Sequence, residues 1–251
     1  MKDNNKEYTI ETGTKSDAAG KLYGIGVGPG NPKLLTLQAL EVIGSCDLIV
    51  LPAKSAEECI AYQIVEQVFP EISRMPLLCM PFPMTRDKQA LESAHGKIYG
   101  EIRKQLLQGK TVGMLTIGDP SIYSTYLYIH KRAAADGLTA QMISGIPSFC
   151  AAAARLGMPL GENAEEIHII PAAYDVADTL SYSGTCIYMK SGKKLKELLE
   201  ILREETGSRS LEICGISNCG MENEKVYHGL EELELAKGYL TIVFVKRQPV
   251  A

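Results

Sequence analysis

The sequence predicts an α/β protein of two lobes, with a mainly parallel sheet in the N-terminal lobe and a mixed sheet in the C-terminal lobe. From residue 21 to residue 143, short apolar strands alternate with helical stretches, which is the order of βαβ units in a parallel sheet. Strands 47–51 and 112–116 are apolar almost throughout, as expected where helices cover both faces of a sheet. Beyond residue 145 the strands follow one another more closely, which favours a second, mixed sheet.

The elements of the N-terminal lobe are expected in a regular order after Lys21. Apolar residues spaced three and four apart give each helix one apolar face, most clearly along the longest helix, at Leu91, Ile98, Ile102 and Leu106. The expected elements are a strand at 22–27, a helix from Leu34 to Ile43, a strand at 47–51, a helix at 57–68, a strand at 76–80, a helix at 88–108, a strand at 112–116, a helix at 121–135 and a strand at 140–143.

The C-terminal lobe is expected to begin with a helix of small residues and to contain one strongly amphipathic helix among its strands. The expected elements are a helix at 148–156, strands at 166–170 and 185–189, a helix at 193–205, and strands at 211–217, 225–228 and 239–245. The polar, small residues at 1–20 predict a disordered tail. We therefore expect a tail at 1–20, an N-terminal lobe at 21–145 and a C-terminal lobe at 146–251.

Composition excludes several classes of function. A formal net charge of −4 disfavours a nucleic-acid partner, because such proteins usually carry a basic face. No segment approaches the roughly 18 consecutive apolar residues of a membrane span, so no membrane association is expected. The seven cysteines are scattered without a C-x-x-C pair, which predicts reduced thiols, a cytoplasmic location and no metal site.

Alternating glycines over residues 24–30 end the first strand and invite comparison with the dinucleotide-binding pattern G-x-G-x-x-G. The third glycine of that pattern is replaced by Pro29 or by Asn31, depending on where the count begins. Pro29 and Pro32 also remove backbone N–H groups that would bind phosphate. A ribose-binding acid belongs at the end of the second strand, whereas Asp47 stands at its start. The turn therefore disfavours a nicotinamide or flavin cofactor.

A second turn, at 116–125, follows the buried strand 112–116 and contains the sequence Gly118-Asp119-Pro120. Ligands of open α/β sheets bind beyond the carboxyl ends of the strands, which is where this turn lies. Gly118 allows close approach of the backbone, and Ser121 can cap the next helix. The turn alone is equally consistent with a binding loop and with a capped turn in which Asp119 is solvated.

Four segments of the chain form a set whose order and spacing are specific: YGIGVGPGNPKLLTLQAL at 23–40, LTIGDPSIYST at 115–125, SGIPSFCAAAARLGMPL at 144–160 and CIYMKS at 186–191. Together they resemble the tetrapyrrole (corrin/porphyrin) methylase family, and the resemblance spans Lys21 to Arg247. With PFPMTRD at 81–87, the sequence is most similar to the precorrin-2 and cobalt-factor II C-20 methyltransferases of that family.

The resemblance implies a two-lobed tetrapyrrole methylase fold, a homodimer, and an enzyme that binds S-adenosyl-L-methionine (SAM) between its lobes. The reaction it implies is methyl transfer to the C-20 meso carbon of precorrin-2 or cobalt-factor II (cobalt-sirohydrochlorin) in cobalamin biosynthesis. Two positions depart from the family pattern and affect local loop geometry: Ser144 replaces a proline, and Asn31 replaces an acid. Carried over position by position, the SAM site comprises Pro29, Gly118, Asp119, Ile122, Pro147, Ser148, Met189 and Gly220.

The implied substrate carries acetate and propionate groups, so the cleft is expected to gather positive charge locally. Candidate cations are Lys54, Arg86, Lys88, Lys190, Lys193 and Lys194. Arg86 and Asp87 are assigned to substrate binding because they lie in the loop beside the expected mouth of the cleft. Tyr123 is the catalytic candidate for removing the proton from the methylated carbon, with Asp87 and water as alternatives.

Three other functions remain open at this point. A sibling methylase of the same family would form sirohydrochlorin or act at C-11 or C-17. A non-catalytic module would bind SAM or a tetrapyrrole without releasing S-adenosylhomocysteine. A nicotinamide-dependent oxidoreductase would bind a dinucleotide instead.

Overall fold

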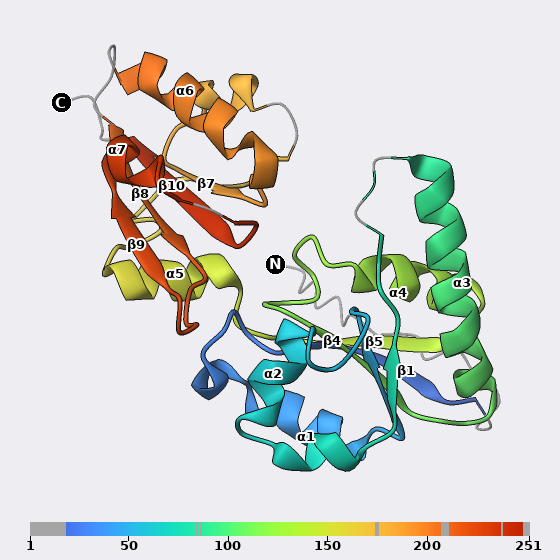
Figure 1. Cartoon of the computed structure of the whole chain (residues 1–251). Helices are drawn as coiled ribbons and strands as arrows, with labels where there is room; N and C mark the ends of the chain where they lie inside the picture. The colour runs from blue at the N-terminus through green and yellow to red at the C-terminus, as the bar shows by residue number, and fades with distance from the viewer. Residues whose placement is uncertain are drawn as a thin grey trace, which may run out of the picture.

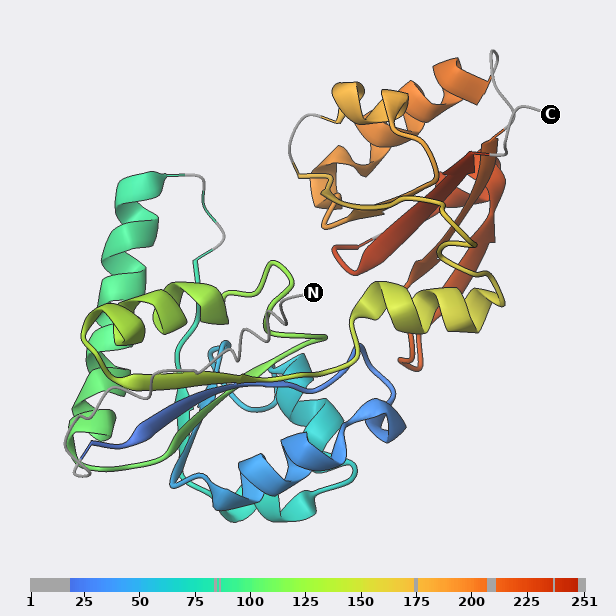
Figure 2. The same cartoon turned by 180° about the vertical axis from the view of Figure 1, so that it is seen from behind.

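The computed structural model describes residues 19–83, 85, 87–173, 176–206, 211–236 and 238–247, apart from the side chains of residues 180 and 193. Most of the predicted tail at 1–20 therefore lies outside the described residues. The described chain forms two lobes, each built on a five-stranded sheet (Figures 1 and 2). No helix within the described ranges is long and apolar enough to cross a membrane.

The sheet of the N-terminal lobe is entirely parallel and has the strand order β3-β2-β4-β1-β5. Its strands are β1 (Lys21–Gly26), β2 (Leu48–Leu51), β3 (Leu77–Cys79), β4 (Val112–Thr116) and β5 (Thr139–Ile143). Strands β2 and β4 are buried at every residue, because both sit inside the sheet with helices on either face. The carboxyl ends of β1 and β4 are in register at Gly26 and Thr116, so the loops that follow them meet.

Helices cover both faces of this parallel sheet (Figures 1 and 2). One face packs against α1 (Leu37–Ser45) and α2 (Ile60–Glu66), and the other against α3 (Lys88–Leu107) and α4 (Tyr126–Ala135). Successive strand residues alternate between the two cores, because side chains of a strand point to opposite faces. Between these elements lie two 3₁₀ turns, Pro32–Leu34 and Pro70–Arg74.

The sheet of the C-terminal lobe is mixed, as predicted, and has the strand order β6-β7-β10-β8-β9. Only β6 and β7 pair in parallel, and the other three pairings are antiparallel. The strands are β6 (Ile167–Pro171), β7 (Thr185–Met189), β8 (Leu211–Ser217), β9 (Lys225–His228) and β10 (Thr241–Arg247). One face packs against α5 (Ser148–Leu156), and the other packs against α6 (Leu195–Thr206) and α7 (Gly229–Leu233).

The helix predicted at 121–135 is shorter than expected, because α4 begins only at Tyr126. Tyr123 has a left-handed backbone with φ of 47°, which no right-handed helix accommodates. The backbone N–H of Tyr126 donates to the Ser124 hydroxyl at 3.1 Å, so Ser124 rather than Ser121 serves the start of the helix. Residues 117–125 therefore form a loop at the carboxyl end of β4 instead of the first turns of the helix.

Other boundaries also differ from the sequence-based expectation. The helix expected from Leu34 begins at Leu37, because Pro32–Leu34 forms a separate 3₁₀ turn. The helix predicted at 57–68 is shorter and gives way to the 3₁₀ turn before β3. The helix predicted at 193–205 starts with a 3₁₀ turn, Gly192–Lys194, and a further 3₁₀ turn, Ala177–Ser181, precedes β7. The last strand lies two residues later than expected, at Thr241–Arg247. The ends of helices and strands depend on local capping interactions, and the spacing of apolar residues does not predict these.

Candidate functional site

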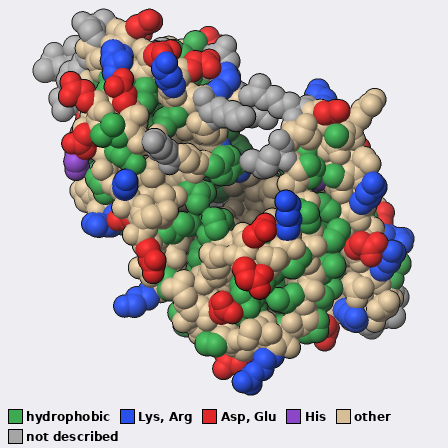
Figure 3. All heavy atoms as spheres, viewed as in Figure 1, with side chains coloured by type: hydrophobic (Ala, Val, Ile, Leu, Met, Phe, Trp, Pro, Cys, Tyr) green, Lys and Arg blue, Asp and Glu red, His purple; other side chains and the backbone are tan. Residues whose placement is uncertain are grey.

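A cavity of about 400 Å³ lies between the two lobes. The space-filling view shows it as a hollow with many hydrophobic side chains around it (Figure 3). The N-terminal lobe contributes the loops after β1, β2, β3 and β4 and the start of α2. The C-terminal lobe contributes the start of α5, the end of β7 and the start of β10. The cavity is thus at the carboxyl edge of the parallel sheet, where open α/β sheets bind ligands.

Four glycines allow the loops at this edge to pack backbone against backbone. A Cβ on Gly145 would lie 2.1 Å from the carbonyl oxygen of Gly118, and one on Gly26 would lie 2.6 Å from that same oxygen. Gly28 and Gly118 exchange backbone hydrogen bonds, and both have positive φ, 77° and 73°. The alternating glycines therefore serve close contact between loops.

Asp119 fastens the loop after β4 to the turn that joins the two lobes. Its Oδ2 accepts a hydrogen bond from the backbone N–H of Gly145 at 3.0 Å. Its Oδ1 accepts from the backbone N–H of Ser121 at 2.8 Å and also from the Ser121 hydroxyl. The residue is only 8% exposed, so the interpretation of Asp119 as a solvated cap is wrong. Its carboxylate holds together two of the loops that line the cavity.

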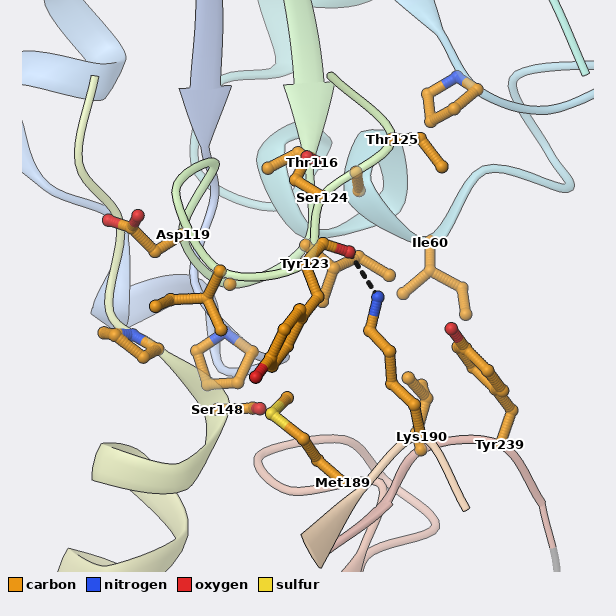
Figure 4. Close-up of a pocket in the computed structure, with 18 of the residues that line it drawn as sticks. Ile60, Thr116, Asp119, Tyr123, Ser124, Thr125, Ser148, Met189, Lys190 and Tyr239 are labelled. Atoms are coloured by element: carbon orange, nitrogen blue, oxygen red, sulfur yellow. Dashed lines mark hydrogen bonds between the residues drawn. The ribbon is translucent and has the colours of Figure 1, made fainter. Parts of the chain in front are cut away.

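Tyr123 connects the two lobes across the cavity (Figure 4). Its hydroxyl donates to the backbone carbonyl of Ile169 at 3.0 Å, and its own carbonyl accepts a hydrogen bond from the ammonium group of Lys190. Lys190 directly follows β7 and, like Tyr123, has a left-handed backbone, with φ of 58°. Burial lowers the pKa of the Lys190 ammonium group.

The wall on the side of the C-terminal lobe includes Met189 and Cys219, and Gly220 follows Cys219 behind this wall. Met189 is buried and lines the cavity. A Cβ on Gly30 would lie 2.5 Å from the carbonyl oxygen of Cys219, and one on Gly220 would lie 2.6 Å from the backbone nitrogen of Asn31. The first glycine turn thus packs directly against the C-terminal lobe.

Two cysteines line the cavity without the properties of a nucleophile. Burial is the main cause that raises the pKa of the Cys59 thiol, and burial likewise raises the pKa of Cys219 to about 11. Both thiols are therefore protonated at neutral pH, whereas a nucleophilic cysteine reacts as the thiolate. The cavity offers apolar walls and a few polar groups, which is the usual composition of a small-molecule site.

The structure brings most of the predicted site residues together. Eight of them line the cavity: Pro29, Gly118, Asp119, Ile122, Tyr123, Pro147, Ser148 and Met189. Gly220 lies behind the wall, beside Asn31. Asp87 is exposed at the start of α3, where its carboxylate accepts from the backbone N–H groups of Gln89 and Ala90. Arg86 lies outside the described residues.

Sequence reasoning did not single out several residues that line the cavity. Pro52 and Ala53 follow β2, so the rule that ligands bind at carboxyl ends of strands would have found them. Phe82 also lines it and lies in the segment PFPMTRD, from which only Arg86 and Asp87 were selected. Ile60 and Tyr239 line it as well, but no motif or spacing marks them. They reach the cavity through the tertiary arrangement of loops, which a single sequence does not reveal.

Comparison with known proteins gives a consistent result. Residues 21–234 match the family model described as Tetrapyrrole (Corrin/Porphyrin) Methylases. The chain is 36% identical over 234 residues to a protein of Methanocaldococcus jannaschii named "Probable cobalt-precorrin-2 C(20)-methyltransferase", covering 90% of this chain and 96% of that protein. It is 27% identical to the precorrin-2 C(20)-methyltransferase of a Sinorhizobium species, covering 73% of this chain and 78% of that protein.

Solved structures show the same fold. A cobalt precorrin-4 methyltransferase superposes with a TM-score of 0.71 at 18% identity, covering 93% of this chain and 97% of that one. A uroporphyrin-III C-methyl transferase from Thermus thermophilus, solved with S-adenosylhomocysteine, superposes with a TM-score of 0.67 at 17% identity, covering 90% and 97%. With a family match over most of its length and a relative at 36% identity, this chain belongs to the tetrapyrrole (corrin/porphyrin) methylase family.

Proposed function

We propose that this protein transfers a methyl group from SAM to C-20 of precorrin-2 or cobalt-precorrin-2 in cobalamin biosynthesis. The observation that carries the proposal is the near full-length similarity to the M. jannaschii relative, whose name states that substrate and that carbon. Two further relatives named for the same position, from Salmonella typhimurium and a Sinorhizobium species, support the assignment over C-11 or C-17.

The cavity suits SAM in size and chemistry. A volume of about 400 Å³ falls within the range of small-molecule sites. Pro29, Ile122, Pro147 and Met189 provide apolar walls for an adenine ring and a thioether. Ser148 adds a polar group at the start of α5. We assign the predicted SAM residues that line the cavity to this role, with Gly220 supporting the wall from behind.

Methylation of carbon forms a C–C bond, breaks an S–CH₃ bond and then removes the proton of the methylated carbon. Bound SAM supplies an electrophilic methyl group and a neutral thioether as leaving group. The protein holds the two reactants in line, and such positioning supplies much of the catalysis. Asp119 contributes by fixing the loop after β4 against the interlobe turn, which keeps the walls of the cavity in place.

We propose Tyr123 as the catalytic residue for proton removal. Its hydroxyl proton is donated to the Ile169 carbonyl, so the oxygen retains lone pairs that can accept a hydrogen bond from a water taking up the departing proton. Replacing Tyr123 by Phe is expected to lower kcat about a hundredfold, the smaller end of general acid–base effects. KM for the tetrapyrrole should change little. Turnover at the wild-type rate in steady-state assays would remove Tyr123 from this role.

Substrate binding is assigned to the loop at 81–87, from which Arg86 supplies a positive charge and Asp87 fixes the start of α3. The Arg86→Ala variant is expected to weaken tetrapyrrole binding while the affinity for S-adenosylhomocysteine stays constant. Titration calorimetry with each ligand measures both quantities. An equal loss for the two ligands would speak against the assignment.

The deciding experiment uses SAM with a ¹³C-labelled methyl group and, in parallel, precorrin-2 and cobalt-precorrin-2 under anaerobic conditions. NMR of the product is expected to show the labelled methyl at C-20, with release of S-adenosylhomocysteine. A label at C-11 or C-17 would identify a sibling methylase. Tight binding without release of S-adenosylhomocysteine would identify a non-catalytic module. Comparison of the two substrates shows whether the macrocycle is used with or without cobalt.

We also propose that the protein is a cytoplasmic homodimer. Free thiols at all seven cysteines support a reducing compartment. Apolar side chains beside the edge strand β5 support a dimer contact, since Leu37 is 86% and Met142 is 37% exposed. The two lie in one region, because the Thr36 hydroxyl donates to the Ser144 carbonyl at 3.3 Å. Analytical ultracentrifugation is expected to give a dimer for the wild type and a monomer for Leu37→Glu.

A further inference from the structure

The ammonium group of Lys190 crosses the cavity to reach the opposite lobe. It comes from the residue after β7 and donates to the backbone carbonyl of Tyr123, in the loop after β4 (Figure 4). Both residues have left-handed backbones, with φ of 58° and 47°. Such conformations cost of the order of 1 kcal/mol each and cluster at ligand sites. The fold therefore maintains strained backbone at both ends of this one hydrogen bond.

Lys190 carries a charge that no described carboxylate balances. Among the described residues that line the cavity it is the single Lys or Arg. Two carboxylates, those of Glu58 and Asp119, also line it, but Asp119 is bound to Gly145 and Ser121, and neither carboxylate forms an ion pair with Lys190 among the described residues. Within the described chain no ion pair includes Lys190, whereas the neighbouring Lys194 pairs with Glu197 at 3.3 Å. A partly buried cation without a counter-ion is unfavourable, and burial lowers the pKa of the Lys190 ammonium group. An anionic ligand would compensate the charge.

The position of Lys190 separates two parts of the cavity (Figure 4). Asp119 and Ser148 lie on one side of the Tyr123 side chain. Ile60 and Tyr239 lie on the other side, next to Lys190. Asp119 and Ser148 belong to the residues assigned to SAM, whereas Lys190 lies on the other side of Tyr123, so its ammonium group is available to the second reactant.

We infer that Lys190 binds a carboxylate of the tetrapyrrole's acetate or propionate groups and thereby positions the macrocycle, exchanging its hydrogen bond to Tyr123 for an ion pair. This inference rests on the proposed function and adds a positioning residue to it. The methionine carboxylate of SAM could also pair with an ammonium group. That arrangement would, however, place the Lys190 ammonium group near the positively charged sulfonium of SAM, and the two like charges repel each other. The experiment therefore measures the two ligands separately.

The test compares Lys190→Met, Lys190→Arg and the control Lys196→Met. Lys196 lies on α6 with its side chain 89% exposed, so its replacement removes the same charge far from the cavity. For Lys190→Met, KM for precorrin-2 is expected to rise about 30-fold, equal to about 2 kcal/mol of binding free energy. The affinity for S-adenosylhomocysteine should be unchanged, Lys190→Arg should recover most of the loss, and Lys196→Met should behave as the wild type.

A second measurement uses sirohydrochlorin and its methyl ester, whose carboxylates are neutral, in equilibrium binding without turnover. The wild type is expected to prefer the acid over the ester by a larger factor than Lys190→Met does, since the variant lacks the cation that distinguishes them. Equal preference in both proteins would overturn the inference. So would a loss of S-adenosylhomocysteine affinity in Lys190→Met that equals the loss for the tetrapyrrole, because Lys190 would then only tether the lobes. Failure of the proposed function is seen separately, as absence of C-20 methylation by the wild type.

Discussion

At the scale of single residues, Asp119 shows how a charged side chain serves a binding site without touching the reaction. Its two oxygens accept hydrogen bonds from three donors on two loops, the backbone N–H groups of Ser121 and Gly145 and the Ser121 hydroxyl. A carboxylate is the side chain that can accept on both oxygens, whereas an amide has one accepting oxygen and one donating nitrogen. The choice of Asp at this position follows from the donors around it.

We predict that Asp119→Asn loses both stability and cofactor affinity. The amide nitrogen must face one of the two backbone donors, which leaves a buried N–H without a partner and costs about 2 kcal/mol. The melting temperature measured by calorimetry should fall by about 4–8 °C, the shift expected for that loss in a chain of this size. Affinity for S-adenosylhomocysteine should fall as well. The matched variant Ser121→Ala removes one donor and should lower stability by less than half as much; equal effects of the two changes would contradict this account.

At the scale of elements, the site depends on how closely the loops after β1, β4 and β5 approach. Gly26 and Gly145 lie so close to the carbonyl oxygen of Gly118 that neither has room for a Cβ, and Gly118 itself has a positive φ of 73°. The helical glycine Gly96 in α3, by contrast, has open space where a Cβ would stand. The same residue type is therefore required in the loops and dispensable in the helix.

We predict opposite effects for alanine at these two kinds of position. Gly145→Ala should destabilise the protein by about 3 kcal/mol or more, since its Cβ would meet backbone that cannot move aside. Gly96→Ala should stabilise it by about 0.5–1 kcal/mol through helix propensity. Urea denaturation of both variants measures the two changes. A neutral Gly145→Ala would show that the loops do not pack as described.

The packing of α3 against α4 gives the protein a pH-dependent stability. His95 is only 4% exposed and its ring stacks on Tyr128 with centroids 4.2 Å apart. Burial first, and the nearby Arg132 second, lower its pKa, against an opposing effect of Glu92. The unfolded chain therefore binds a proton at a pH where the folded protein does not. The free energy of unfolding must then decrease as the pH falls below about 6.5, the ordinary pKa of histidine.

We predict that His95→Gln reduces this dependence, because its side chain stays neutral throughout. Unfolding free energies measured by urea denaturation between pH 7 and pH 5 should fall less for the variant than for the wild type. Replacement of the exposed His228 by Gln serves as control and should leave the slope unchanged. A wild-type slope retained in His95→Gln would assign the effect to other groups, such as His130, whose pKa burial also lowers.

The elements themselves could largely be predicted from the sequence, because apolar spacing follows from the burial of helix and strand faces. The predicted boundaries are wrong where local side-chain hydrogen bonds or the backbone conformation determine the end of an element. The apolar pattern of α4 extends into the preceding loop and predicts too early a start, whereas the left-handed backbone of Tyr123 prevents the helix from beginning there. Glycines at 26, 118 and 145 mark close contacts, but which loops they join emerges only from the folded structure.

At the scale of the whole molecule, the cavity exists only while the two lobes stay together. Besides the chain at the interlobe turn, the lobes are joined by the hydrogen bonds of Tyr123 to Ile169 and to Lys190, and by the contact of Gly30 with Cys219. The motifs of the resemblance identified residues on both sides of the cavity. Residues such as Tyr239, which no motif marks, complete it through the arrangement of the lobes.

We predict that a ligand between the lobes stabilises both of them together. S-adenosylhomocysteine at a concentration a hundredfold above its Kd should add about 2.7 kcal/mol to the free energy of unfolding, which raises the melting temperature by about 5–11 °C. The assigned residues belong to both lobes: Pro29 and Gly118 to the N-terminal lobe and Met189 to the C-terminal lobe. Calorimetry should therefore show the entire unfolding transition shifting to higher temperature. NAD⁺ at the same concentration should leave the melting temperature unchanged. The glycines of the first turn make close backbone contacts and are not open to a phosphate group. A shift with NAD⁺ and none with S-adenosylhomocysteine would refute the assignment of the cavity to a methyl donor.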